Sequence, residues 1–289
     1  MIMIERLAII GVGLIGGSLS LALKQAGAVR HVVGCGRNLQ NLQKGVEIGV
    51  IDSFESSIAD AIESADMIVV AVPLGAMASV FEQISNNIGK DAVVTDVGSA
   101  KGSVVKVAKA ALGANFSQFV PGHPIAGNEK SGVEAGFATL YQNRRVILTP
   151  VDETDKTAIQ RVDAMWQQCG ASIEYLEIEH HDKVLAATSH LPHMLAYAMV
   201  NYLSSLNEHD EIFRYAAGGF RDFTRIASSD PVMWRDVCLS NGAALLKFIE
   251  GYKEELDMIS AAIKADDADA LLKLFGKAKS ERDSLIGNC

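Results

Sequence analysis

Short apolar runs alternate with amphipathic stretches along the first part of the chain. The runs have the length of buried strands and occupy Arg6–Ile10, Val29–Gly34, Met67–Val72 and Ala92–Val97. Apolar positions at helical spacing predict helices at Ile15–Ala26, Asn38–Ile48, Leu74–Ile88 and Lys101–Leu112. Strands that alternate with helices are typical of a doubly wound parallel sheet, so the pattern predicts an α/β domain.

The α/β pattern continues to about residue 178. It predicts a later strand of the sheet at Arg145–Pro150, then a helix at Asp152–Cys169 and a strand at Ser172–Leu176. We therefore predict a first domain over residues 1–178.

Only helical spacing is found after Ile178. It predicts a long helix kinked at Pro192, a helix begun by Asp230 and Pro231, and a last amphipathic helix, at Glu179–Leu206, Trp234–Ile259 and Asp266–Ser284. We predict an all-α second domain over residues 179–289, with apolar faces that favour a homodimer.

A glycine motif follows the first strand and opens the first helix. Its glycines are Gly11, Gly13 and Gly16, with Leu14 and Ile15 between the last two. Glycine permits a tight turn and a close approach of the backbone to a pyrophosphate, which the helix N-terminus then binds. The motif predicts a Rossmann dinucleotide-binding domain in which these five residues bind the cofactor. The alternative is a glycine-rich turn that binds no ligand.

The end of the second strand bears on which cofactor binds. NAD enzymes usually carry a carboxylate there for the ribose diol, but this chain has Gly36 followed by Arg37. A guanidinium binds a 2′-phosphate, whereas a carboxylate would repel it. The sequence therefore favours NADP over NAD. The alternative is that Arg37 is a solvated loop residue and the enzyme uses NAD.

The carboxyl ends of parallel strands meet at one rim of the sheet, where ligands bind. Besides the glycine motif, this rim collects Arg37, Val72, Pro73, Ser99 and His123. Ser99 has an alternative role as the N-cap of the following helix. Lys101, in the first turn of that helix, is expected at the surface.

One histidine stands out in the first domain. His123 lies between Gly122 and Pro124, which fix the backbone path and leave the imidazole at a loop late in the nucleotide-binding pattern.

Two more histidines lie on the long helix of the second domain. His190 and His193 share a helix face beside Pro192. They lack the glutamate of HExxH and a nearby third ligand, so no metal site is predicted. A satisfied core histidine is the alternative for one of them.

A polar segment interrupts the second domain. It contains Gly218, Arg221, Asp222 and Arg225 and is followed by Trp234. Arg225 or Arg221 could clamp the carboxylate of an anionic substrate, since a guanidinium donates paired hydrogen bonds. The alternative is a surface turn with ion pairs.

Composition and charge limit the classes of molecule that the chain is expected to bind. The formal net charge of −9 argues against nucleic acid, and a small anion would need local cations. No apolar run is long enough for a membrane span. Cys35, Cys169, Cys238 and Cys289 show no paired spacing, so we expect reduced thiols in a cytoplasmic protein.

Five motifs in this order give the chain its resemblance to a known family. They are the glycine motif, Asp96–Lys101, Gly122–Gly127, Ser189–His193, and Gly218–Arg225 with Ser229–Pro231 and Trp234. Together they resemble the prephenate/arogenate (cyclohexadienyl) dehydrogenase family of tyrosine biosynthesis, over almost the whole chain.

The resemblance implies a role for each matching residue. His123 matches the catalytic histidine, and Ser99 a serine that contacts that histidine and the substrate. His193, Arg225, Gly218 and Trp234 match residues of the substrate pocket, the arginine binding a carboxylate, and His190 belongs to the same motif. Asp222 matches a residue near the dimer-related site.

The implied reaction is oxidative decarboxylation of prephenate or L-arogenate with NAD(P)+. The sequence does not choose between these substrates. One alternative is a β-hydroxyacid dehydrogenase, for which Lys183 would have to be the acid/base. Another is a nucleotide-sensing protein without catalysis.

Overall fold

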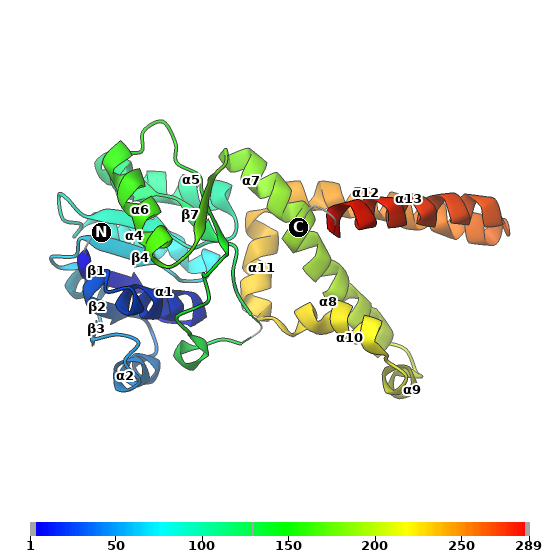
Figure 1. Cartoon of the computed structure of the whole chain (residues 1–289), viewed down its shortest axis with the longest axis horizontal. Coiled ribbons are helices and arrows are strands. Elements are labelled where there is room, and N and C mark those ends of the chain that lie inside the picture. Colours follow the sequence, from blue (N-terminus) through cyan, green and yellow to red (C-terminus); the bar gives the residue numbers. More distant parts are fainter. Residues whose placement is uncertain (1–3, 129, 287–289) are drawn as a thin grey trace. The chain divides into compact units, whose positions relative to one another are not determined.

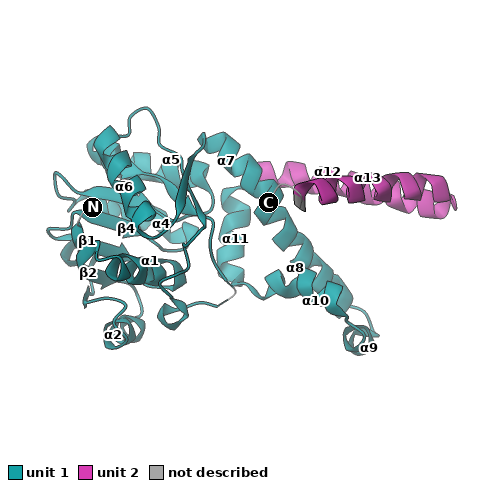
Figure 2. Ribbon diagram, in the orientation of Figure 1, with its two compact units in different colours: residues 1–242 teal, residues 243–289 magenta. Residues whose placement is uncertain are grey.

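The fold is described from a computed structural model, over residues 4–128 and 130–286 (Figure 1). The chain forms two compact units, residues 1–242 and 243–289 (Figure 2). These units are not the predicted domains, and the boundary near residue 178 stays a prediction.

A six-stranded parallel sheet organises the first unit. Its strands are β1 (Ile4–Ile10), β2 (Val29–Cys35), β3 (Ser53–Glu55), β4 (Met67–Val70), β5 (Val93–Asp96) and β6 (Phe119–Val120). Their order in the sheet is β3-β2-β1-β4-β5-β6, and every pair is parallel. The predicted doubly wound sheet is confirmed; the short strands β3 and β6 were not predicted.

Helices cover both faces of this sheet (Figure 1). They are α1 (Leu14–Gln25), α2 (Leu39–Glu47), α3 (Ile58–Ile62), α4 (Met77–Ser85), α5 (Lys101–Leu112) and α6 (Lys156–Gln168). Side chains of β1 alternate between the faces. Leu7 and Ile9 pack in the core under α1 and α6, while Ala8 and Ile10 pack in the core under α3, α4 and α5. Burial on both faces explains why the strands are continuous apolar runs.

A second, three-stranded sheet corrects one prediction. It contains β7 (Gly122–Pro124), β8 (Arg145–Leu148) and β9 (Ser172–Tyr175), with β7 antiparallel to β8 and β8 parallel to β9. The strand predicted at Arg145–Pro150 therefore exists but is not part of the main sheet. Pro121 follows β6 and has no N–H to continue the ladder, so the chain leaves the main sheet there and pairs anew.

The predicted long helix is present in three parts. It comprises α7 (Ile178–Leu185), a π-helical turn η4 (Ala186–His190) and α8 (Leu191–Ser204). Pro192 is the second residue of α8, two positions after the π turn, as expected from a residue that cannot complete the helical ladder. The first unit ends with α9 (His209–Arg214), α10 (Gly218–Thr224), a 3₁₀ turn η5 (Arg225–Ser228) and α11 (Pro231–Ser240).

The helix predicted at Trp234–Ile259 is not continuous. Asp230 caps α11 as expected, accepting from the Met233 N–H at 2.8 Å, but α11 ends at Ser240. The buried Asn241 side chain donates to the Asp182 carbonyl at 2.8 Å and lies 3.2 Å from His190 Nδ1. These contacts fix a break at Asn241 that helical spacing cannot reveal.

The second unit consists of α12 (Gly242–Lys264) and α13 (Ala268–Ile286). Their connection contains Asp266 in the left-handed region (φ 52°) and Asp267, which caps α13 by accepting from the Ala270 N–H. Within the described ranges, no helix has the length and apolar character needed to cross a membrane.

Candidate active site

The glycine turn between β1 and α1 is fixed by close packing. Gly11 has φ +102°, and a Cβ there would lie 2.4 Å from the Ala71 carbonyl oxygen. A Cβ on Gly16 would lie 2.5 Å from the Gly11 carbonyl oxygen. Both positions therefore require glycine for the fold itself.

Gly13 differs from the other two glycines. In the described part of the chain, a Cβ there would meet nothing within 4 Å, and Gly13, the N-cap of α1, has no side chain that could cap the helix. The first amides of α1 are thus open to an anion. This arrangement fits a dinucleotide pyrophosphate. Leu14 is buried and Ile15 half-buried at the start of the helix.

The rim beyond β2 carries charges of both signs. Arg37 is exposed, and none of the described hydrogen bonds or ion pairs involves it. Glu55 ends β3 directly beside Cys35. The pKa of the Cys35 thiol is raised, chiefly by burial, with smaller contributions from the carboxylates of Glu55 and Asp60. The end of β2 carries no carboxylate, but Glu55 supplies one at the end of the neighbouring strand β3.

The rim beyond β4 is tied to the helical part of the unit. Val72 is half-buried and Pro73 exposed. Asp236 of α11 accepts from the Gly75 N–H at 3.0 Å, and a Cβ on Gly75 would lie 2.7 Å from the same carboxylate. The loop that follows β4 is thus held against α11.

A buried ion pair holds the rim beyond β5. Lys101 Nζ lies 2.5 Å from Asp96 Oδ2 and donates to the Gly122 carbonyl at 2.7 Å, and both side chains are fully buried. Burial lowers the pKa of Lys101, while the Asp96 carboxylate opposes that shift. The prediction that Lys101 lies at the surface was wrong. The first turn of α5 faces the β6–β7 corner, where the ammonium joins two segments.

Ser99 is half-buried on the same rim, and no described hydrogen bond engages its hydroxyl. Its alternative role as a helix cap was wrong, because the N-cap of α5 is Ala100. The first amides of α5 are instead capped from another helix. Asp182 of α7 accepts from the N–H groups of Lys101 at 2.7 Å and Gly102 at 2.8 Å.

His123 lies on β7, next to these groups, where it pairs with Ile147 of β8; the prediction that it lies in a loop was wrong. A Cβ on Gly122 would lie 3.1 Å from the Asp96 carbonyl oxygen, so the residue before His123 is confined by the end of β5. The imidazole is half-buried, and its Nδ1 lies 2.9 Å from Nε2 of His181. The pKa of His123 is well below its usual range because burial, then His181, Lys101 and His190, disfavour the cation.

His181 is a site residue that sequence reasoning missed. It is fully buried, and its Nδ1 lies 2.9 Å from Asp182 Oδ1. Burial lowers the pKa of His181 against the opposing effect of Asp182. No spacing links His181 to His123, which are 58 residues apart. The available signal was a His-Asp pair on the first helix after the sheet.

A second cluster lies on α8, η5 and α11. The ring of His193 stacks on Trp234 at 3.8 Å, and its Nδ1 donates to the Ser189 carbonyl at 2.8 Å. Burial lowers the pKa of His193, the hydrogen bond to the Ser189 carbonyl opposes this shift, and the charge of Arg225 lowers the pKa further. The structure therefore brings together His193, Trp234 and Arg225.

His190 connects the two clusters. It is buried, and burial lowers its pKa to about 4, with opposing influence from Asp182 and further lowering by His181 and His193. His190 Nε2 and Trp234 Nε1 are buried and have no hydrogen-bond partner among residues 4–128 and 130–286. Gly218, Arg221 and Asp222 lie on α10, exposed, before Arg225.

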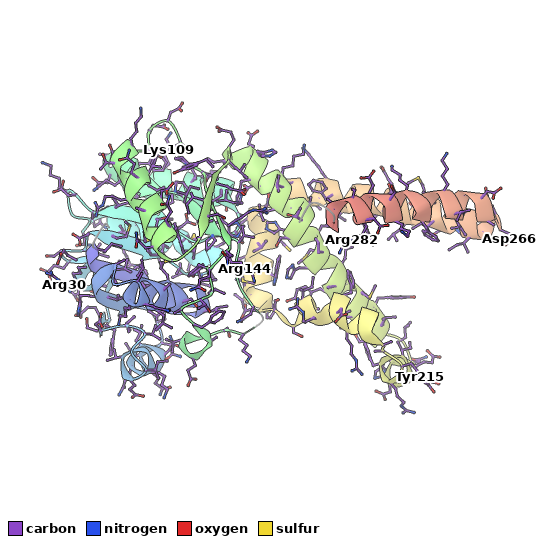
Figure 3. The ribbon with its side chains drawn as sticks, in the orientation of Figure 1. Arg30, Lys109, Arg144, Tyr215, Asp266 and Arg282 are labelled. Carbon is purple, nitrogen blue, oxygen red and sulfur yellow. The ribbon has the colours of Figure 1, made fainter. Side chains whose placement is uncertain are left out.

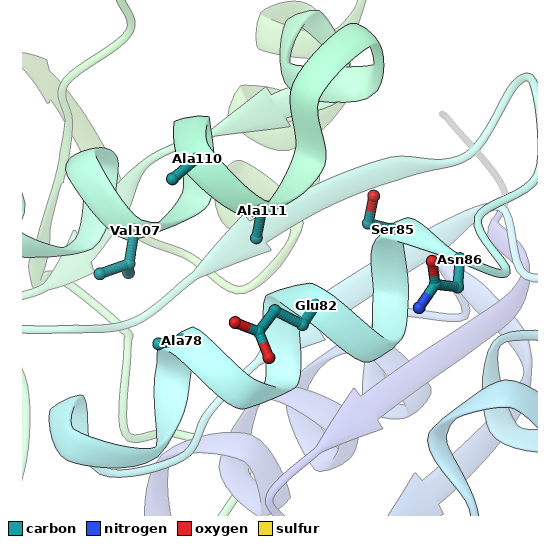
Figure 4. Close-up of a pocket in the computed structure, with 7 residues that line it drawn as sticks. All are labelled: Ala78, Glu82, Ser85, Asn86, Val107, Ala110 and Ala111. Atoms are coloured by element: carbon teal, nitrogen blue, oxygen red, sulfur yellow. The ribbon is translucent and has the colours of Figure 1, made fainter.

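A surface groove lies outside these clusters. A groove between α4 and α5 contains none of the predicted site residues; it is lined by Ala78, Glu82, Ser85, Asn86, Val107, Ala110 and Ala111 (Figure 4). Among residues 4–128 and 130–286, no three His, Cys, Asp or Glu side chains are grouped so as to hold a metal ion.

Family models match most of the chain. Residues 19–175 match the nucleotide-binding domain of prephenate dehydrogenase, and residues 177–277 match its dimerization domain. The chain belongs to the prephenate dehydrogenase family. The predicted family, its dehydrogenase class and the α/β-plus-helical fold are thereby confirmed.

Individual relatives agree with this membership. The chain is 36% identical to the cyclohexadienyl dehydrogenase of Zymomonas mobilis, over 99% of this chain and 97% of the relative. It is also 36% identical to the prephenate dehydrogenase of Bacillus subtilis, over 97% of this chain and 76% of the relative.

Solved structures of this family have the same fold. The prephenate dehydrogenase of A. aeolicus in complex with hydroxyphenyl propionate and NAD+ has a TM-score of 0.91 and 38% identity, covering 97% of this chain and 98% of that one. The arogenate dehydrogenase of Synechocystis has a TM-score of 0.79 and 26% identity, covering 97% and 100%.

Proposed function

We propose that the chain catalyses the oxidative decarboxylation of prephenate, of L-arogenate or of both, with NAD(P)+ as hydride acceptor. The observation that carries the proposal is the imidazole of His123. It lies beyond the carboxyl ends of β5 and β6, with Nδ1 held by His181 at 2.9 Å and Nε2 engaged by no described hydrogen bond. A neutral histidine beside a dinucleotide site is suited to accept a proton from a substrate hydroxyl.

The reaction balances with one base. When bound, the nicotinamide cofactor accepts the hydride that leaves the ring carbon bearing the hydroxyl. His123 takes the hydroxyl proton as charge develops, and returns it to the ring oxygen after the ring carboxylate leaves as CO2. The electron pair of the broken carbon–carbon bond enters the ring and makes it aromatic. The protein's part is orientation and polarisation.

The remaining site residues have positioning roles in this proposal. Ser99 contacts the hydroxyl and His123, while Arg225 binds a substrate carboxylate and His193 lines the pocket with His190, Trp234 and Gly218. The charge of Arg225 acts on His193, which supports a common cationic pocket. A chain of net charge −9 needs such local cations to bind a dianion.

The glycine turn with Val72, Pro73 and Arg37 binds the cofactor, for which NADP is preferred in this proposal. Support comes from Gly36 and the exposed Arg37. Glu55 acts in the opposite direction, since its carboxylate at the end of β3 repels a 2′-phosphate. Arg37→Ala should weaken NADP binding more than NAD binding, measured as the two Kd values; an equal effect contradicts the preference.

The proposal includes a homodimer formed through the helical domain, with Asp222 near the partner's site. The match of residues 177–277 to a dimerization domain supports it.

Initial rates test the activity directly. Prephenate and L-arogenate are each assayed with NAD and with NADP, following reduced cofactor at saturating concentrations. At least one combination should turn over with release of CO2. No turnover in all four would favour a nucleotide-sensing protein. The β-hydroxyacid dehydrogenase alternative has less support, because Lys183 is exposed on α7.

A further inference from the structure

The contacts of Asp182 make it a hydrogen-bond acceptor, and not a donor, toward His181. Its two oxygens accept from the N–H groups of Lys101 and Gly102, at 2.7 and 2.8 Å, at the start of the 12-residue helix α5. A helix N-terminus favours the ionised carboxylate. An ionised carboxylate has no proton to donate. In the Asp182–His181 contact the ring therefore donates, from Nδ1 at 2.9 Å.

This donation determines the other nitrogen of His181. A neutral imidazole carries one proton, so with Nδ1 protonated Nε2 is an acceptor. Complete burial of the ring and the buried ammonium of Lys101 nearby both disfavour a second proton on His181. His123 Nδ1 lies 2.9 Å from this acceptor and must donate to it.

We propose that His181, oriented by Asp182, is a positioning residue that holds His123 in the Nδ1–H tautomer and so directs the Nε2 lone pair at the substrate. The chain runs from the α5 amides through Asp182 and His181 to His123, and each contact measures 2.7–2.9 Å. The inference rests on the proposed function for what His123 accepts from, but the tautomer itself is a property of the protein alone.

The tautomer is read by NMR without any substrate. Protein labelled with [15N]histidine at pH 7 gives ring signals for its seven histidines, and His123→Asn and His181→Gln identify the two that matter. We expect His123 with a protonated Nδ1 and an unprotonated Nε2. A protonated Nε2 on His123 in the unmodified protein would overturn the proposal.

Two substitutions of His181 separate positioning from packing. His181→Leu keeps bulk but removes the acceptor, so His123 should lose its fixed tautomer and kcat should fall roughly ten- to a hundredfold, less than after loss of a base itself. His181→Gln supplies an amide oxygen as acceptor and should restore much of kcat and the Nδ1–H tautomer. KM should change little in both.

The neighbouring histidine provides a matched control. His180 is exposed on the same helix, and His180→Leu should leave kcat and the His123 signals unchanged. If His181→Leu keeps both the tautomer and kcat, the contact is only structural. If His181→Leu fails to fold, the NMR result on the unmodified chain still decides. If all four substrate assays show no turnover but His123 has the expected tautomer, the proposed function is contradicted and this inference is supported.

Discussion

At the scale of single residues, the site is a set of histidines kept neutral. Burial lowers the pKa of His123, His181, His190 and His193. In each case a neighbouring cation or a second histidine lowers the pKa further. A neutral His123 can act as an acceptor, whereas a cation could not. The apolar surroundings therefore contribute to the chemistry as well as to the core.

The pH profile follows from this. Because the folded pKa of His123 lies well below 6.5, the neutral form persists as the pH falls below that value. We expect kcat/KM to stay level down to pH 6.5 and to fall only below it. A descending limb centred at or above pH 6.5 contradicts the assignment. The limb should be absent from the residual activity of His123→Asn.

Substitutions at two glycines of the nucleotide turn should have different effects, one on cofactor binding and the other on stability. Gly13→Ala adds a Cβ that meets nothing within 4 Å, so the protein should fold normally. The methyl group would obstruct the approach of a pyrophosphate, and we expect the cofactor Kd to rise tenfold or more, about 1.4 kcal/mol.

Gly16→Ala is the matched comparison. Its Cβ would lie 2.5 Å from the Gly11 carbonyl oxygen, so it should lower the free energy of unfolding. Equal effects of the two changes on stability would contradict this division, as would a normal Kd in Gly13→Ala.

At the scale of elements, the N-terminus of α5 is the junction of the site. Asp96 from β5, Asp182 from α7 and the carbonyl of Gly122 at the start of β7 all meet the first turn of this helix. Through these contacts one helix end positions the Ser99 loop, the strand of His123 and the helix of His181. Damage to this junction should affect both stability and chemistry.

Removal of the Lys101 charge tests the junction. Lys101→Met leaves the fully buried Asp96 carboxylate without its cation, and breaking a buried pair typically costs about 3–5 kcal/mol. We expect the free energy of urea unfolding to fall accordingly. Lys109→Met is the control on the same helix. Lys109 lies at the surface (Figure 3). It pairs with Glu153, and its loss should change little. Similar losses in both variants would show that the buried pair contributes nothing special.

Local pattern was enough to predict β1, β2, β4, β5, β8, β9 and the glycine turn, but not the short strands β3, β6 and β7. Apolar runs and a turn motif express forces between near neighbours in the chain, so β1, α1 and the parallel sheet follow from them. The second sheet, the burial of Lys101 and the break at Asn241 depend on partners far away in sequence. The contact of His123 with His181 spans 58 residues and exists only once the fold has formed.

At the scale of the whole molecule, the second unit presents unusual apolar exposure. Seven apolar side chains of α12 and α13 are at least 46% exposed: Leu246, Leu256, Met258, Ile263, Leu272, Phe275 and Leu285. Surfaces of this kind mark protein–protein contacts. A dimer would cover them.

Solution mass tests the dimer. The chain of 30.9 kDa should sediment at twice that mass. Leu272→Asp, at a position 73% exposed, should yield monomers, because burying a carboxylate at an interface is costly. Leu39→Asp on α2, where the leucine is 53% exposed, should leave the dimer intact. A monomeric unmodified chain contradicts the proposal.

The central claim is that His123 accepts the substrate's proton beside a bound dinucleotide. Its most direct test is the steady-state kinetics of the His123→Asn variant, with the cofactor Kd of the same variant measured in parallel. We predict that kcat falls by about 10²–10⁴-fold while the cofactor Kd stays within about twofold, since the base is lost and the glycine turn is untouched. Near-normal turnover in this variant would contradict the account.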